Sequence, residues 1–131
     1  MIEVIGHEST DPDALTVVRS LAISLDAVSP ATHDIEITVV PAPVVTDGDG
    51  FGFAAFYIDD GRPKMCIAGE KVDEITRDDW LADMLPSDVA HEWAHYEQWR
   101  DGRPVQERGV AVRARTLLRR AAWYRDTGEC R

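Results

Sequence analysis

The two halves of the chain differ in the types of residue they contain, and no linker separates them. All the tryptophans lie in residues 77–131, whereas most runs of β-branched residues lie in residues 1–76. Because no stretch rich in Ser, Gly or Pro joins the halves, we interpret them as two layers of one domain. A length of 131 residues with 44% hydrophobic residues is enough for one hydrophobic core. The sequence therefore predicts a single domain over residues 1–131, of the α+β class.

The first half predicts a helix that is followed by strands. Thr10 to Asp13 supply a capping side chain, a proline for the first turn and acidic residues, which is typical of a helix start. The apolar spacing that follows predicts a helix over residues 12–27. Residues 35–40 then alternate apolar and polar side chains, as a half-buried strand does.

Two further strands are predicted to form a β-hairpin. The segments 51–58 and 64–68 are strand-like, and the intervening Asp60-Gly61 favours a tight turn. A repeated Asp-Gly pair at 47–50 predicts another turn just before the first of these strands. The expected sheet is therefore small, and either antiparallel or mixed.

The second half predicts two or three helices. Thr76 to Asp79 resemble a capping box and predict a short helix that ends at Leu85-Pro86. A second helix is expected from about residue 88 to 100, where Asp101 to Pro104 form a turn. The last helix is expected over about 105–125. The predicted architecture is thus an N-terminal helix and a small sheet, followed by these helices.

Charge and cysteine content restrict the partners and the compartment. Fourteen Lys+Arg against 24 Asp+Glu give a net charge of −10, and such a field repels phosphate backbones and anionic lipids. We therefore expect neither nucleic acid nor a membrane as a partner. No signal peptide or membrane-spanning run is recognisable, which predicts a cytoplasmic protein. In that compartment Cys66 and Cys130 are expected to be reduced thiols.

The pentapeptide His91-Glu92-Trp93-Ala94-His95 lies inside the predicted helix 88–100. Four residues advance a helix by about 400°, so His91 and His95 project from one face and can bind the same metal ion. Glu92 lies about 100° around the helix, beside that ion rather than on it. A carboxylate there can accept a proton from metal-bound water and pass it to a leaving amine. The spacing therefore predicts two zinc ligands and a general base.

This segment resembles the active-site helix of the zincin metallopeptidases. The resemblance implies a Zn²⁺ cofactor, a third protein ligand and a position kept for water. In the gluzincin arrangement a Glu on the following helix faces the two histidines, and Glu107 opens the predicted last helix. The turn at 101–104 would fold that helix back toward the ligand helix, which also favours Glu107.

Asp101 stays open as an alternative third ligand. It stands six residues after His95, where the metzincin-like pattern places its last ligand. Gln98 occupies the position at which that pattern has a glycine for a sharp turn. The two candidates therefore differ in the element that carries them, a turn for Asp101 and a helix for Glu107.

The resemblance is strongest over residues 85–120 and implies a minimal zincin-like fold. Small intracellular members of the group, including peptidases encoded by phages and prophages, show a similar order of elements. The resemblance implies hydrolysis of peptide bonds in a protein or peptide substrate. Zincins also lay the substrate along an edge strand, and Met65 to Ala68 are interpreted either as such a strand, which binds a peptide by strand addition, or as core residues of the sheet with nothing bound.

Several polar residues have roles that the sequence leaves open. Oxyanion stabilisation needs a hydrogen-bond donor, for which the candidates are His33, Tyr57, Tyr96, Arg113 and Tyr124. Tyr96 is expected to pack in the core rather than to act in catalysis. Gln98 is interpreted either as a hydrogen-bond partner of a metal ligand or as a surface side chain.

The sequence thus predicts a zinc-dependent peptidase with His91, His95 and Glu107 as metal ligands and Glu92 as general base. Two alternatives stay open. The chain is a noncatalytic zinc-binding or protein-interaction module that retains the zincin fold, or it is a structural α+β domain in which the pattern arose by chance. The oligomeric state is not predicted.

Overall fold

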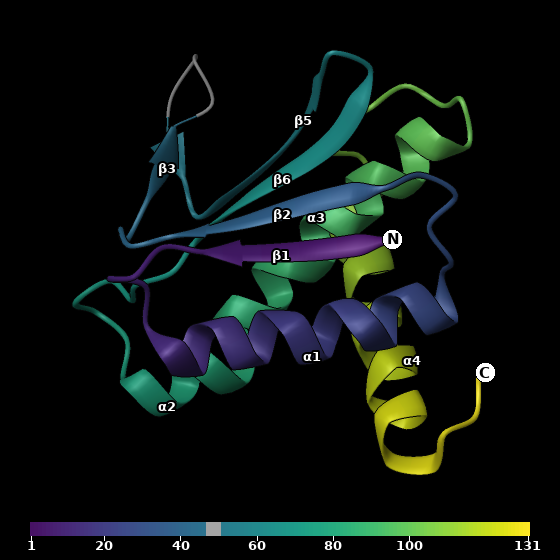
Figure 1. Ribbon diagram of the computed structural model, residues 1–131. Helices are drawn as coiled ribbons and strands as arrows, with labels where there is room; N and C mark the ends of the chain where they lie inside the picture. The colour runs from purple at the N-terminus through teal and green to yellow at the C-terminus, as the bar shows by residue number, and fades with distance from the viewer. Residues whose placement is uncertain (47–50) are drawn as a thin grey trace.

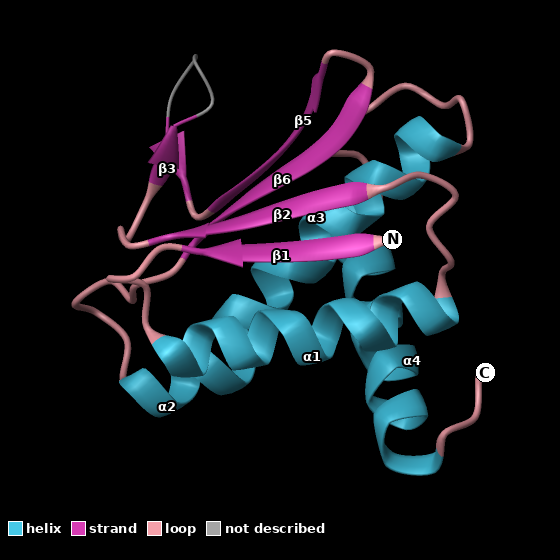
Figure 2. Ribbon diagram, in the orientation of Figure 1, coloured by secondary structure: helices cyan, strands magenta, loops and turns pink. Residues whose placement is uncertain are grey.

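A four-stranded sheet with helices gathered on one side forms the fold of the computed structural model, which describes residues 1–46 and 51–131 (Figures 1 and 2). The strand order is β1 (Ile2–Gly6), β2 (Ile35–Val40), β6 (Arg62–Ala68) and β5 (Ala54–Asp59). β1, β2 and β6 are parallel, and β5 pairs with β6 in the antiparallel direction. The α+β class and the mixed sheet predicted from the sequence are confirmed.

The N-terminal part forms a β1–α1–β2 unit. Helix α1 (Pro12–Val28) begins where Asp11 accepts hydrogen bonds from the backbone N–H groups of Asp13 and Ala14. The prediction of a helix over 12–27 is confirmed to within one residue. Strand β1 was not predicted, because a parallel edge strand depends on its distant partner β2 rather than on a local turn.

The predicted hairpin is present as β5 and β6. Asp60 and Gly61 join the strands with φ values of 52° and 74°, the left-handed geometry of a two-residue turn. The segment 51–58 is not one strand, since it contains β4 (Phe51–Gly52) and most of β5. β4 pairs with β3 (Val45–Thr46), and the turn predicted at 47–50 lies outside the described residues.

Strand β6 is an interior strand of the sheet. It pairs with β2 on one side and with β5 on the other. The prediction that Met65 to Ala68 bind a peptide by strand addition is therefore wrong, because both edges of this strand already have partners. The edge strands of the sheet are β1 and β5.

The predicted helix break at Leu85-Pro86 does not occur. Helix α2 (Arg77–Asp79) continues through the π-helical segment η1 (Trp80–Met84) into α3 (Leu85–Arg100). The N–H of Leu85 donates to the carbonyl oxygen of Trp80, five residues back. This wider turn accommodates Pro86, which has no N–H and would otherwise clash with the preceding turn. The ligand helix consequently begins earlier than the predicted residue 88.

The last helix, α4 (Val110–Thr127), begins later than the predicted residue 105. Gly109 precedes it with φ 80°, a left-handed conformation that a continuous helix cannot include. Residues 103–109 therefore form a connecting loop, and Glu107 lies in that loop rather than in the first turn of a helix.

Helix α3 lies at the centre of the molecule. It contacts the sheet through β5 and β6, and it contacts α1 and α4 on its other sides. Its residues from Val89 to Gln98 are almost all buried, and Trp93 and Tyr96 are fully enclosed. Cys66 and Cys130 are free thiols, as expected. Among the described helices, none has the length and apolar character needed to cross a membrane.

Candidate metal centre

His91 and His95 lie one turn apart on α3 and face Glu107. The Nε2 atom of His91 is 2.9 Å from Oε2 of Glu107, and Nε2 of His95 is 2.9 Å from Oε1. The two imidazole centroids are 5.0 Å apart. One ligand atom from each of the three residues lies within 4.8 Å of the others. The structure therefore brings together the three residues that the sequence analysis assigned as ligands.

The loop between α3 and α4 positions Glu107. It turns back at Gly102, which has φ 72°, and the N–H of Arg103 donates to the carbonyl oxygen of Gln98 at 2.8 Å. The side chain of Glu107 is 76% exposed, whereas that of His95 is 7% exposed. Burial alone would raise the pKa of Glu107, but hydrogen bonds and charge from His95 and His91 hold it below its usual value.

Gln98 joins the buried ligand to this loop. Its Oε1 atom accepts from the backbone N–H of Gln106 at 3.1 Å, and its Nε2 atom donates to the carbonyl oxygen of Gln106 at 3.0 Å. These two bonds fix the orientation of the amide. The same Oε1 atom is 3.0 Å from Nδ1 of His95. Gln98 is only 6% exposed, so it is a partner of a metal ligand and not a surface side chain.

This hydrogen bonding determines which nitrogen of His95 is free. Because Oε1 of Gln98 can only accept, Nδ1 of His95 carries a proton, so that Nε2 is the nitrogen that presents a lone pair whenever the ring is neutral. That lone pair faces a carboxylate oxygen of Glu107 at 2.9 Å. Two acceptors at this distance repel each other unless a cation, either a proton or a metal ion, lies between them. The arrangement is thus one that a cation stabilises.

The donor set fits a divalent metal ion such as zinc. Two imidazole nitrogens and one carboxylate form a common zinc ligand set that leaves one position open. Ligand atoms of a tetrahedral zinc ion with bonds of 2.0–2.1 Å lie about 3.3 Å apart. Each histidine is 2.9 Å from Glu107, so a small outward shift of this exposed side chain would suffice.

Glu92 lies beside the three ligands in a buried position. It is 6% exposed and lies on α3, one residue after His91. Burial raises the pKa of Glu92 to about 7, the carboxylates of Glu107 and Asp88 add to the rise, and His95 opposes it. A carboxylate whose pKa lies near neutrality can both accept and release a proton there.

Asp101 does not join the cluster of His91, His95 and Glu107. It ends α3, and its carboxylate is paired with Arg100 at 2.9 Å and with Arg103 at 3.5 Å. The hydrogen bond from Arg100 lowers the pKa of Asp101. Of the two candidates for the third ligand, the structure therefore brings only Glu107 to the histidines.

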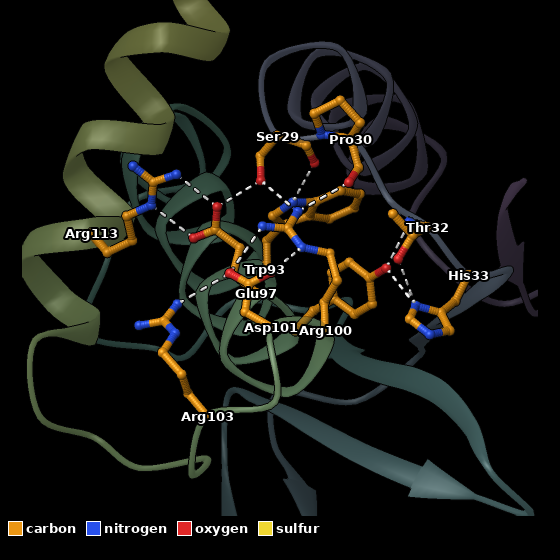
Figure 3. A network of polar contacts seen from close by, with 11 residues as sticks. Ser29, Pro30, Thr32, His33, Trp93, Glu97, Arg100, Asp101, Arg103 and Arg113 are labelled. Atoms are coloured by element: carbon orange, nitrogen blue, oxygen red, sulfur yellow. Dashed lines mark hydrogen bonds and ion pairs between the residues drawn. The ribbon is translucent and has the colours of Figure 1, made fainter.

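The candidates for oxyanion stabilisation are mostly engaged in other contacts. The hydroxyl of Tyr96 accepts from the N–H of Thr32 and is 2.9 Å from Nδ1 of His33, while Arg113 binds Glu97 (Figure 3). Tyr96 is fully buried, which confirms the expectation that it packs in the core. Tyr57 lies on the edge strand β5. Tyr124 lies about 20 Å along α4 from its first residue, far from the loop with Glu107.

No family model, no curated protein and no solved structure matches this chain. The arguments for its function therefore rest on the residues and geometry of the centre itself.

Proposed function

We propose that this chain is a zinc-dependent peptidase that hydrolyses peptide bonds of a protein substrate in the cytoplasm. The observation that carries the proposal is the convergence of both histidine Nε2 atoms on the two oxygens of Glu107. Glu92 adds a buried carboxylate beside this cluster. The pattern of residues, the order of elements and the donor set all agree with the resemblance to zincins.

Each residue of the centre has a defined part in this proposal. His91, His95 and Glu107 would hold the zinc ion, which when bound lowers the pKa of water and polarises the carbonyl of the scissile bond. Glu92 takes the proton of the attacking water and delivers it to the leaving amine. Gln98 keeps the proton of His95 on Nδ1, so that Nε2 stays available as a ligand.

Strand β5 offers the binding surface for the substrate backbone. It is an edge strand of the sheet, it runs antiparallel to β6, and it contacts α3, the helix with the histidines. An extended peptide can add to such an edge through main-chain hydrogen bonds. In the proposal, a peptide on β5 lies alongside the ligand helix, which interior strand β6 does not allow.

Metal content tests the ligand set directly. We expect one zinc ion per chain by elemental mass spectrometry of tag-free protein, and loss of that zinc in His91→Ala and Glu107→Ala. Asp101→Ala is the matched control, because it removes an acidic side chain from the same connection and should keep the zinc. Protein that takes up no zinc after incubation, or that loses zinc only in Asp101→Ala, would overturn the ligand assignment.

Peptide hydrolysis tests the activity. Wild-type protein and Glu92→Gln would be incubated with a proteome-derived peptide mixture, and new termini would be identified by mass spectrometry. We expect cleavage by the wild type and none by Glu92→Gln, with zinc content and unfolding temperature equal in both. Zinc binding without cleavage would instead identify a noncatalytic zinc-binding module.

A further inference from the structure

A large groove lies on the helical layer, away from the metal centre. It has a volume of about 980 Å³ and is bounded by α1, η1, the start of α3 and α4. Leu21 of α1, Leu81 of η1 and Leu118 of α4 line it together, and each of these leucines is partly exposed. None of the three metal-centre ligands lines it. The groove is therefore an apolar surface that the proposed peptidase activity does not use.

The groove has about the volume of a short helical segment. An α-helix with its side chains is about 10–12 Å wide, and two of its turns occupy roughly 850–1,200 Å³. This range includes the volume of the groove. Small side chains such as Ser20, Ala121 and Ala122 in the lining let the backbone of a guest helix approach closely.

The charged side chains that line the groove are mostly positive, whereas the protein as a whole is negatively charged. Arg115, Arg119 and Arg125 of α4 line the groove, together with the single carboxylate of Asp83. The chain as a whole carries a net charge of −10. Arg125 pairs with Asp126 at 3.1 Å, whereas Arg115 and Arg119 have no carboxylate partner among the described residues. These arginines are available to acidic groups of a partner.

A second copy of the chain is a poor occupant. A guest helix must offer several apolar side chains on one face. The exposed large apolar residues of α1 and α4 are Ile23 and Val112, one on each helix. Across the described residues, no helix carries a free apolar face that would fill the groove of another copy. A flat lipid surface also fails to match a concave groove.

From this combination we propose that the groove binds an amphipathic helix of a partner protein. The helix presents leucine-like side chains to the floor of the groove and carboxylates to Arg115 and Arg119. Binding of this kind uses apolar anchors at helical spacing, and the charges select the partner and its orientation. The site is independent of the metal centre and does not require zinc.

Two synthetic peptides, together with a control peptide that lacks leucines, test the proposal with the metal-free chain. Each of the two has about twelve residues, roughly three turns of helix, with leucines at helical spacing. One carries Glu beside the leucines, and the other carries Lys at the same positions. Fluorescence anisotropy should show at least about tenfold tighter binding of the Glu peptide. Amide shifts in NMR spectra should map this binding to α1, η1 and α4. A third peptide, with Ser in place of the leucines, should not bind.

Charge-reversal variants provide the matched controls. Arg119→Glu should weaken binding of the Glu peptide by about tenfold, because it replaces an attraction with a repulsion. Arg19→Glu makes the same change at an exposed position of α1 outside the groove and should leave the affinity unchanged. Any of the following results would overturn the proposal: no binding of the Glu peptide, equal binding of both peptides, shifts on other elements, a dimer in sedimentation, or Arg119-dependent binding to anionic phosphatidylserine vesicles.

Discussion

Two faces of helix α3 bury polar side chains, but they satisfy them differently. Trp93, Tyr96, Glu97 and Arg100 follow helical spacing and form what we term the network face. Their partners come from the segment that follows α1 and from Arg113 of α4, and Trp93 donates to the carbonyl oxygen of Ser29 at 3.2 Å (Figure 3). On this face, donors meet acceptors.

Glu97 is the best satisfied group of the network face. Its side chain is 3% exposed and accepts from Nε and Nη2 of Arg113, each at 2.7 Å. It also accepts from the hydroxyl of Ser29 at 2.6 Å. A buried carboxylate with a bidentate arginine and a further donor ties α3 to α4 and to the end of α1.

The opposite set, His91, Glu92, His95 and Gln98, forms the centre face. Here Nε2 of His95 faces an acceptor, a carboxylate oxygen of Glu107, at 2.9 Å, so that a cation, either a proton or a metal ion, has to lie between the two atoms. Glu92 is buried without a hydrogen bond to a described residue, and its raised pKa has burial as the first cause. The contrast teaches that one face is built for stability, whereas the other maintains a costly arrangement that a bound cation would relieve.

The largest expected effect concerns Glu92. Glu92→Gln keeps the shape of the side chain and removes its ability to take a proton, so peptide hydrolysis should fall by about 10²–10⁴-fold. Stability should not fall, because the carboxylate has no hydrogen bond to lose. Activity assays and urea unfolding of the same variant would check both parts. A variant that is active but unfolded more easily would place Glu92 with the network face instead.

The next effect belongs to the network face. Arg113→Met leaves the buried carboxylate of Glu97 without its main partner and should lower the free energy of unfolding by about 2–3 kcal/mol, somewhat less than for a fully buried pair because the arginine is 38% exposed. Arg115→Met makes the same change at an exposed position of the same helix and should have little effect. Zinc affinity should be nearly the same in both variants. Equal stability of the two variants would contradict the role assigned to this face.

A smaller effect is expected at Gln98, the residue of the centre face that holds the loop before Glu107. Gln98→Leu removes the partner of His95 and both anchors of Gln106, so zinc affinity should fall by about 10–100-fold. Gln106→Leu is the matched control, because only its backbone takes part in this contact. Isothermal titration with zinc would measure both affinities. If both variants bind zinc as tightly as the wild type, Gln98 does not position the ligand.

The sequence predicted the parts of the fold that local signals determine. The capped helix α1, strand β2 and the Asp60-Gly61 hairpin each have a signature within a few residues. Strand β1 and the interior place of β6 were missed, because strand order depends on pairing between distant segments. The continuous helix through Pro86 was missed because a π-helical turn leaves no clear mark in a sequence.

In the candidate site, too, the local features were predicted from the sequence and the tertiary contacts were not. The spacing of His91 and His95 is a local property and could be read directly. The position of Glu107 was predicted, but on a helix rather than a loop, because the bonds from Gln98 to the backbone of Gln106 are tertiary. The sequence left Gln98 open between a partner of a metal ligand and a surface side chain, because the loop that folds back on it decides between the two. Its place three residues after the second histidine was the signal in the sequence.

The most subtle difference between the faces concerns the pH dependence of stability in the metal-free protein. Burial alone would raise the pKa of Glu97, but hydrogen bonds from Arg113 and Ser29 outweigh it and hold the pKa below 4.5. The stabilising contribution of Glu97 is therefore complete above pH 4.5 and is lost as the pH falls through the lowered value. Glu97→Gln should remove this acid dependence.

Asp88, one turn before Glu92, should show the opposite sign. Burial raises its pKa from 3.8 to about 7, so the folded state resists ionisation and stability falls as the pH rises between these values. Asp88→Asn should then stabilise the metal-free protein at neutral pH, whereas Asp83→Asn, at an exposed position of η1, should not. Urea unfolding from about pH 3 to pH 8 would reveal both slopes. Equal signs for Glu97 and Asp88 would contradict the division of α3 into a stabilising face and a costly one.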